Sequence, residues 1–80
     1  MFTVKVIETS SGRPVKGAKV SVGFNGLLRG FTKYEYTDSD GEVHFDNDNA
    51  TGSIYVDGQR KYEGHIEGRK TINVQLRFWL

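Results

Sequence analysis

The chain has 80 residues, no Cys, and eleven Lys and Arg against ten Asp and Glu, which gives a formal net charge of +1. We therefore expect one domain over residues 1–80, with a core too small for a deep cofactor pocket and with no disulfide, thiolate nucleophile or Cys-ligated zinc. The interspersed charges argue against a nucleic-acid partner, because nucleic-acid binders usually carry a concentrated basic excess.

Apolar and polar residues alternate through most of the chain, and clusters of Gly, Asp, Asn and Ser interrupt the alternation. A period of two predicts strands with one buried face, and the clusters predict the turns between them. Strands are expected over residues 2–8, 18–24 and 30–37, with the only proline, Pro14, in the first loop. The inward face of the third strand is left open. The residues expected to face the core in the first two strands are Phe2, Val4, Val6, Ala18, Val20, Val22 and Phe24.

The second half of the chain continues the same pattern. Strands are expected over residues 42–46, 53–56, 62–66 and 71–79, and Asp57-Gly58 is typical of a tight hairpin turn. Val43 and Phe45 are expected to face inward, and Ile54 and Val56 alternate with Ser53 and Tyr55. Tyr62, Gly64 and Ile66 form a weaker sixth strand, and the last strand has one side made of Ile72, Val74, Leu76, Phe78 and Leu80. Seven short strands without helical periodicity predict an all-β fold, namely a seven-stranded, antiparallel or mixed Greek-key β-sandwich.

Two segments resemble the carboxypeptidase regulatory-like domains, which belong to the transthyretin-like (prealbumin-like) β-sandwiches. They are residues 12–22 (GRPVKGAKVSV) and residues 37–45 (TDSDGEVHF), and the resemblance covers residues 4–58. It implies a transthyretin-like sandwich that serves as a structural or interaction module. The hydrolase branch of this fold acts on 5-hydroxyisourate and ends in Tyr-Arg-Gly-Ser, whereas residues 76–80 read LRFWL. A transthyretin-like hydrolase is therefore only a distant alternative.

No catalytic residues are predicted. The two histidines, His44 and His65, fall on different expected strands, and neither has a nucleophile or further ligands at a useful spacing. None of the serines stands in the G-x-S-x-G context of a nucleophile elbow. The leading hypothesis is a non-enzymatic module that binds a protein or a glycan and needs no cofactor.

The acidic loops suggest a second hypothesis, a calcium-stabilised domain. Asp38, Asp40, Asp46 and Asp48 carry the oxygen ligands that Ca²⁺ prefers. The favoured alternative is that these carboxylates bond their own backbone in turns. The strand over residues 42–45 also separates the two pairs, so we expect them at opposite ends of that strand.

Exposed aromatic residues are the candidates for partner binding. Alternation turns Trp79 outward beside Arg77, and it places Tyr55 and one side of the Tyr34/Tyr36 pair on outer faces. Such rings could stack on a sugar or dock a protein, which would make the chain a carbohydrate-binding or protein-binding domain. The alternative for Trp79 is that its ring folds over the sheet edge and covers the core margin.

Two further expectations concern assembly and compartment. Unpaired sheet edges would allow a homodimer by strand pairing. The amino terminus reads as a strand rather than as a signal peptide, and no run of about 18 apolar residues marks a membrane span. A full-length chain would then be cytoplasmic, whereas a trimmed domain would fit an extracytoplasmic location.

Overall fold

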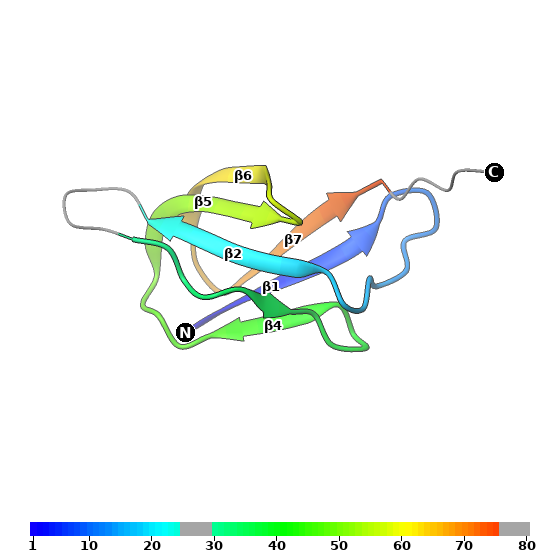
Figure 1. The fold of residues 1–80 in the computed structure, drawn as a ribbon, viewed down its shortest axis with the longest axis horizontal. Helices are drawn as coiled ribbons and strands as arrows, with labels where there is room; N and C mark the ends of the chain where they lie inside the picture. Colours follow the sequence, from blue (N-terminus) through cyan, green and yellow to red (C-terminus); the bar gives the residue numbers. More distant parts are fainter. Residues whose placement is uncertain (25–29, 76–80) are drawn as a thin grey trace.

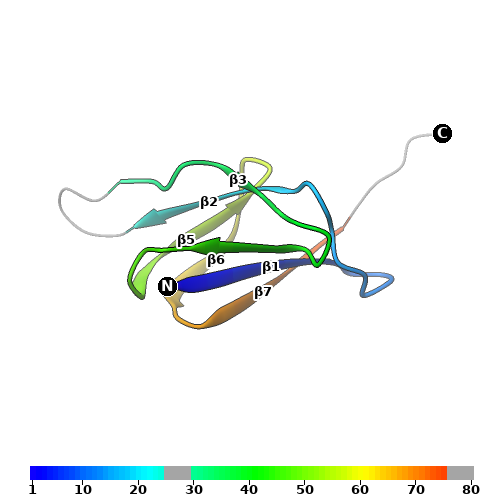
Figure 2. The same ribbon diagram turned by 90° about the horizontal axis from the view of Figure 1, so that it is seen from below.

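In a computed structural model, residues 1–24 and 30–75 are described, and they form seven strands in two sheets without a helix (Figure 1). One sheet has the order β4-β1-β7 and the other has the order β3-β2-β5-β6. Figure 2 shows the two sheets as two layers. The strands are β1 (Phe2–Glu8), β2 (Lys19–Phe24), β3 (Glu35–Tyr36), β4 (Glu42–Phe45), β5 (Ala50–Val56), β6 (Gln59–Ile66) and β7 (Arg69–Val74). The expected all-β, two-sheet architecture is confirmed.

The two sheets differ in strand direction. In the three-stranded sheet β1 runs antiparallel to β4 and parallel to β7, with Val4 opposite Val43 and Val6 opposite Ile72. The four-stranded sheet is antiparallel throughout. Among the described residues, no helix has the length and hydrophobicity needed to cross a membrane.

The core lies between the two sheets and follows the alternation in the sequence. A strand with one buried face buries every second side chain, because successive side chains point to opposite sides. Val4, Val6, Val20, Val22 and Ile54 are completely buried, as expected. The other buried hydrophobic residues of this one cluster are Phe2, Ala18, Val43, Phe45, Val56, Ile66, Ile72 and Val74.

The predicted third strand is wrong in its extent. Strand β3 has only two residues, and residues 30–34 contribute no more than an isolated bridge between Phe31 and Gly23. The reason is that the hydroxyl of Thr32 takes the place of a backbone carbonyl as hydrogen-bond acceptor. Val22 N donates to Thr32 Oγ1 at 2.9 Å, while Thr32 N donates to Val22 O at 2.8 Å. Because Thr32 satisfies both the backbone N–H and the backbone C=O of Val22, regular pairing with β2 begins only at Glu35.

Strands β5, β6 and β7 all begin earlier than predicted. Strand β5 begins at Ala50 rather than at residue 53. Strand β6 begins at Gln59 rather than at residue 62, directly after the Asp57-Gly58 turn. Both turn residues have positive φ, 51° and 85°, as a type I′ hairpin turn requires. Strand β7 begins at Arg69 rather than at residue 71. The predicted inward residues Leu76, Phe78 and Leu80 lie outside the described residues.

The two segments that carry the family resemblance contact each other. Thr37 is buried, and its hydroxyl donates to Val15 O at 2.5 Å and accepts from Ala18 N at 2.8 Å. Gly41 has a φ of +74°, and a Cβ added there would lie 2.5 Å from Val6 O and 3.0 Å from Pro14 Cβ. The threonine and the glycine thus fix the loop before β2 against the turn before β4.

The turn after β1 is held by the carboxylate of Glu8. This carboxylate accepts hydrogen bonds from the backbone N–H groups of Ser10 and Ser11, both at 3.0 Å, and from Ser10 Oγ at 2.7 Å. These bonds, led by the backbone bond from Ser10, lower the pKa of Glu8 from 4.5 to about 2. A lowered folded-state pKa contributes stability above the unfolded value, and this contribution is lost as the pH falls from 4.5 towards 2.

We therefore expect the Glu8→Gln variant to melt at a lower temperature than the wild type at neutral pH. Its melting temperature should also change less between pH 4.5 and pH 2, because the titrating group is gone. Circular dichroism melts over this pH range test the prediction, with Glu35→Gln as an exposed control in β3. The prediction would be contradicted if the melting temperatures of Glu8→Gln and of the wild type changed by the same amount between pH 4.5 and pH 2.

Candidate functional site: an aromatic face on the four-stranded sheet

The outer surface of the four-stranded sheet has a floor of small residues. Val20 and Val22 of β2 point into the core, so Ser21 and Gly23 point outward. The register places Gly23 opposite Ser53 of β5. Ser21 and Ser53 are each only 6% exposed although they are on the outer face. Larger side chains must therefore cover them.

Two aromatic rings form part of this cover. Phe31 lies over Gly23: a Cβ added at Gly23 would be 2.5 Å from Phe31 Cε1. Its ring contacts that of Tyr55, with centroids 5.8 Å apart and planes inclined by 56°. Tyr55 stands opposite Ser21 in the register. The absence of a side chain at Gly23 thus lets Phe31 reach across β2 to a residue of β5.

Two tyrosines extend the surface towards the sheet edge at β3. Tyr36 is opposite Lys19, a residue on the outward side of β2. Lys19 Nζ lies 4.2 Å from the centroid of the Tyr34 ring, which is cation–π geometry. We define the aromatic face as Phe31, Tyr34, Tyr36 and Tyr55 together with Lys19.

Three of the four rings in the aromatic face are largely exposed to solvent. Phe31 is 71% exposed, Tyr36 64% and Tyr34 59%. Single exposed aromatics are ordinary on protein surfaces, whereas large contiguous apolar patches are typical of interaction surfaces. Large amphipathic rings are also the side chains that dominate binding energy when a partner covers them.

The outer face of the other sheet is polar. Thr3 Oγ1 lies 2.8 Å from His44 Nδ1, and His44 Nε2 lies 3.8 Å from Glu42 Oε1. Glu42 also pairs with Arg69 at 3.4 Å and with Lys5 at 4.0 Å. This order of hydroxyl, imidazole and carboxylate superficially matches a nucleophilic triad. However, 3.8 Å is too long for a hydrogen bond, and the carboxylate already has two cationic neighbours.

The two histidines are not brought together. His44 is on β4 of the three-stranded sheet, whereas His65 is on β6 of the four-stranded sheet. His65 Nε2 lies 2.9 Å from Glu67 Oε1, and both side chains are exposed. The described residues therefore offer two separate imidazole–carboxylate pairs on open surfaces.

The acidic loop residues are divided by β4, as expected from their spacing. Asp38 Oδ1 accepts from Asp40 N at 2.9 Å and from Glu42 N at 3.0 Å. The backbone bond from Glu42 is the main reason that the pKa of Asp38 is lowered. Asp46 and Asp48 follow β4 and are exposed. Within residues 1–24 and 30–75, no three acidic or His side chains are grouped to hold a metal ion. Calcium binding at these loops stays a prediction.

The three predicted partner-binding residues have different outcomes. Tyr55 belongs to the aromatic face and is half-buried beneath Phe31. Arg77 and Trp79 lie outside the described residues. Phe31 was not predicted as a site residue. The sequence contains only an indirect indication of its role, because small residues at the outward positions of β2 and β5 predict that a larger side chain covers them.

A comparison of this chain with protein-family models, with curated proteins and with solved structures gives no match.

Proposed function

We propose that this chain is a non-enzymatic binding module with a transthyretin-like, Greek-key β-sandwich fold, and that it holds a protein partner on the aromatic face. The observation that carries the proposal is the exposure of Phe31, Tyr34 and Tyr36, between 59% and 71%, on the outer side of the four-stranded sheet, where Phe31 covers Gly23 and the two tyrosines flank Lys19. Tyr36 lies on β3 and Phe31 forms a bridge to Gly23 of β2, so the main chain at these two rings is already paired before a partner binds, which reduces the ordering that binding requires.

Two features support the proposed fold family. The strand orders β4-β1-β7 and β3-β2-β5-β6, with a parallel β1–β7 pair, are compatible with a two-layer Greek key. Thr37 and Gly41 belong to residues 37–45, and they contact the loop before β2, which lies in residues 12–22. The two segments that carry the family resemblance thus stabilise each other. A fold of this kind is a scaffold, and its function depends on the surface that it presents.

The shape of the aromatic face favours a protein over a glycan. A sugar stacks on a flat, open ring and needs polar groups beside it. The rings of Phe31 and Tyr55 are inclined by 56°, and Lys19 covers one side of the Tyr34 ring. The nearby hydroxyl groups of the floor serines are buried. The face combines inclined aromatic rings with tyrosine hydroxyl groups and the Lys19 ammonium group, a composition that fits a protein–protein interface.

The test compares the wild-type protein with a Phe31→Ala/Tyr36→Ala variant as affinity baits. Proteins retained only by the wild type are then purified, and their dissociation constants are measured by calorimetry. Truncation of an aromatic residue that dominates an interface costs about 2 kcal/mol or more, so Tyr36→Ala should weaken binding about 30-fold. Because Tyr36 is largely exposed, the melting temperature should barely change.

Two matched variants make this test specific. Gly23→Ala should weaken binding by displacing the ring of Phe31, which occupies the space of the added methyl group. Arg69→Ala, on the outer face of the other sheet, should leave the dissociation constant unchanged. A partner that binds Phe31→Ala and Tyr36→Ala as tightly as the wild type would overturn the proposal. Retention of an immobilised polysaccharide by the wild type alone would replace the protein partner with a glycan.

A further inference from the structure

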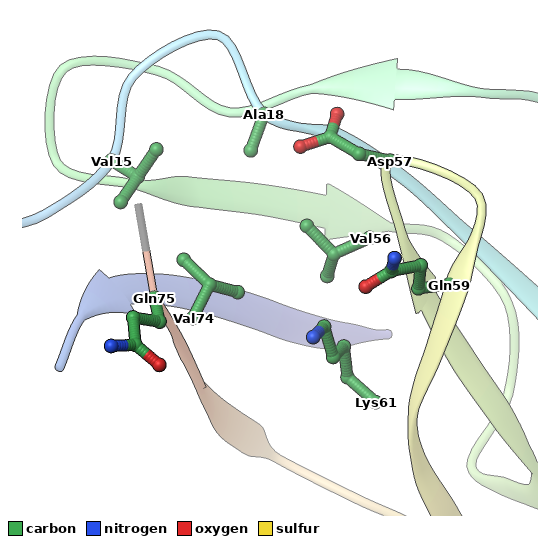
Figure 3. A pocket seen from close by; sticks show the side chains of 8 residues that line it. All are labelled: Val15, Ala18, Val56, Asp57, Gln59, Lys61, Val74 and Gln75. Atoms are coloured by element: carbon green, nitrogen blue, oxygen red, sulfur yellow. The ribbon is translucent and has the colours of Figure 1, made fainter. Parts of the chain in front are cut away.

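A cavity of about 170 Å³ opens at the end of the sandwich where β5 turns into β6 (Figure 3). Its floor is aliphatic and consists of Val15 and Ala18 from the loop before β2, Val56 of β5 and Val74 of β7. Ala18, Val56 and Val74 are all more than 90% buried. Three of the four floor residues therefore belong to the hydrophobic core, and Val15 packs against it.

The rim of the cavity is polar and carries both charges. Asp57 and Lys61 lie on either side of Val56, and the carboxamides of Gln59 and Gln75 complete the rim (Figure 3). All four side chains belong to exposed residues. A ligand that fills the cavity would therefore meet an apolar floor and, at the opening, one anion, one cation and two amide groups.

The volume of the cavity restricts the size of its ligand. An apolar cavity of about 150 Å³ holds a benzene molecule, whereas drug-sized ligands need about 300–1,000 Å³. The present cavity is thus suited to one branched aliphatic side chain and is too small for a nucleotide or a flavin. The polar part of the ligand would remain at the rim.

The charges at the rim indicate what that polar part is. Asp57 has a φ of +51° in the hairpin turn, and its Oδ1 accepts from Lys19 N at 3.1 Å, so the carboxylate is held in place. Within the described part of the chain, Lys61 has no ion pair with an acidic side chain. The ammonium group of Lys61 therefore favours a carboxylate on the ligand, and the carboxylate of Asp57 favours a hydrogen-bond donor on the ligand.

We propose that this cavity binds an aliphatic residue with a free α-carboxylate, such as leucine. The side chain occupies the floor, the α-carboxylate pairs with Lys61, and the α-nitrogen donates to Asp57. Two sources share this chemistry: a free amino acid, whose α-nitrogen is an ammonium group, and the carboxyl-terminal residue of a polypeptide, whose α-nitrogen is an amide. The cavity shares no lining residue with the aromatic face, so this inference does not rest on the proposed function.

The probes are L-leucine, N-acetyl-L-leucine, L-leucinamide and N-acetylglycine, each added to the ¹⁵N-labelled full chain. Amide chemical shifts are followed by NMR. We expect L-leucine or N-acetyl-L-leucine to shift the amides of residues 56–61 and 74, with a dissociation constant of about 1–10 mM for a ligand of this size. L-leucinamide should bind at least tenfold more weakly because it lacks the carboxylate, and N-acetylglycine because it lacks the side chain.

The two leucine probes distinguish the sources. Binding of L-leucine alone indicates a free amino acid whose ammonium group is recognised, whereas binding of N-acetyl-L-leucine indicates a polypeptide carboxyl terminus. Lys61→Glu should weaken binding of the active probe at least tenfold, and the exposed control Lys33→Glu should not. The inference is overturned if neither leucine probe shifts these amides, if L-leucinamide binds equally well, or if Lys61→Glu leaves the affinity unchanged.

Discussion

Replacement of Gly52 by Ala is expected to lower the free energy of unfolding by about 3 kcal/mol, at the top of the usual range for overpacked interiors. Gly52 of β5 is buried and stands opposite Phe24 of β2. A Cβ at this position would overlap the carbonyl oxygen of Gly23 and lie 3.2 Å from Phe24 Cα. Both obstacles are backbone atoms of the neighbouring strand, so only a separation of β2 from β5 could relieve the overlap.

Urea unfolding followed by circular dichroism measures this effect. Gly30→Ala is the matched control, because a Cβ there meets no atom within 4 Å and the backbone does not require glycine. The control should be neutral or slightly stabilising, since alanine restricts the unfolded chain more than glycine does. Equal unfolding midpoints for Gly52→Ala and Gly30→Ala would show that the two strands are less tightly apposed than described.

Replacement of Thr37 by Val is expected to cost about 2–3 kcal/mol. The side chains have nearly the same shape, but valine has no hydroxyl to satisfy Val15 O and Ala18 N. A buried polar group that loses its partner costs about 1–3 kcal/mol. A domain of this size has a total stability on the order of 4–12 kcal/mol, so the loss would be a large fraction of it.

The same unfolding measurement tests this prediction, with Thr37→Ser as the control that keeps the hydroxyl. The serine variant should retain most of the stability and lose only the contribution of one methyl group. If the valine variant proved as stable as the serine variant, the hydroxyl would not be the group that holds the two segments together.

These two positions differ in kind from the aromatic face. Gly52 and Thr37 are buried and hold neighbouring chain segments together, whereas Tyr36 and Phe31 are largely exposed. We therefore expect substitutions to separate into two classes, one that lowers stability and one that lowers partner affinity without unfolding the domain. Because the two classes differ in their effect on stability, a loss of binding at the aromatic face can be distinguished from unfolding of the domain.

Local sequence was sufficient to identify most strands and the core. Alternation of side chains has a period of two whatever the partner strand is, so Val4, Val6, Val20, Val22 and Ile54 could be assigned to the interior from their neighbours alone. Turn residues acted in the same local way at Asp57-Gly58, where the type I′ conformation needs positive φ at both positions.

The third strand and the aromatic face depended on contacts between residues distant in the sequence. Regular pairing before Glu35 is interrupted because the Thr32 hydroxyl bonds to Val22 N, and no alternation pattern records that competition. Phe31 and Tyr55 meet because the strand order places Gly23 between them without a side chain in the way. Period-two patterning assigns each residue to a face of its own strand, but it contains no information on which strands are neighbours or in which register. A surface built from three chain segments therefore follows from the pairing of the strands and not from the pattern of any one of them.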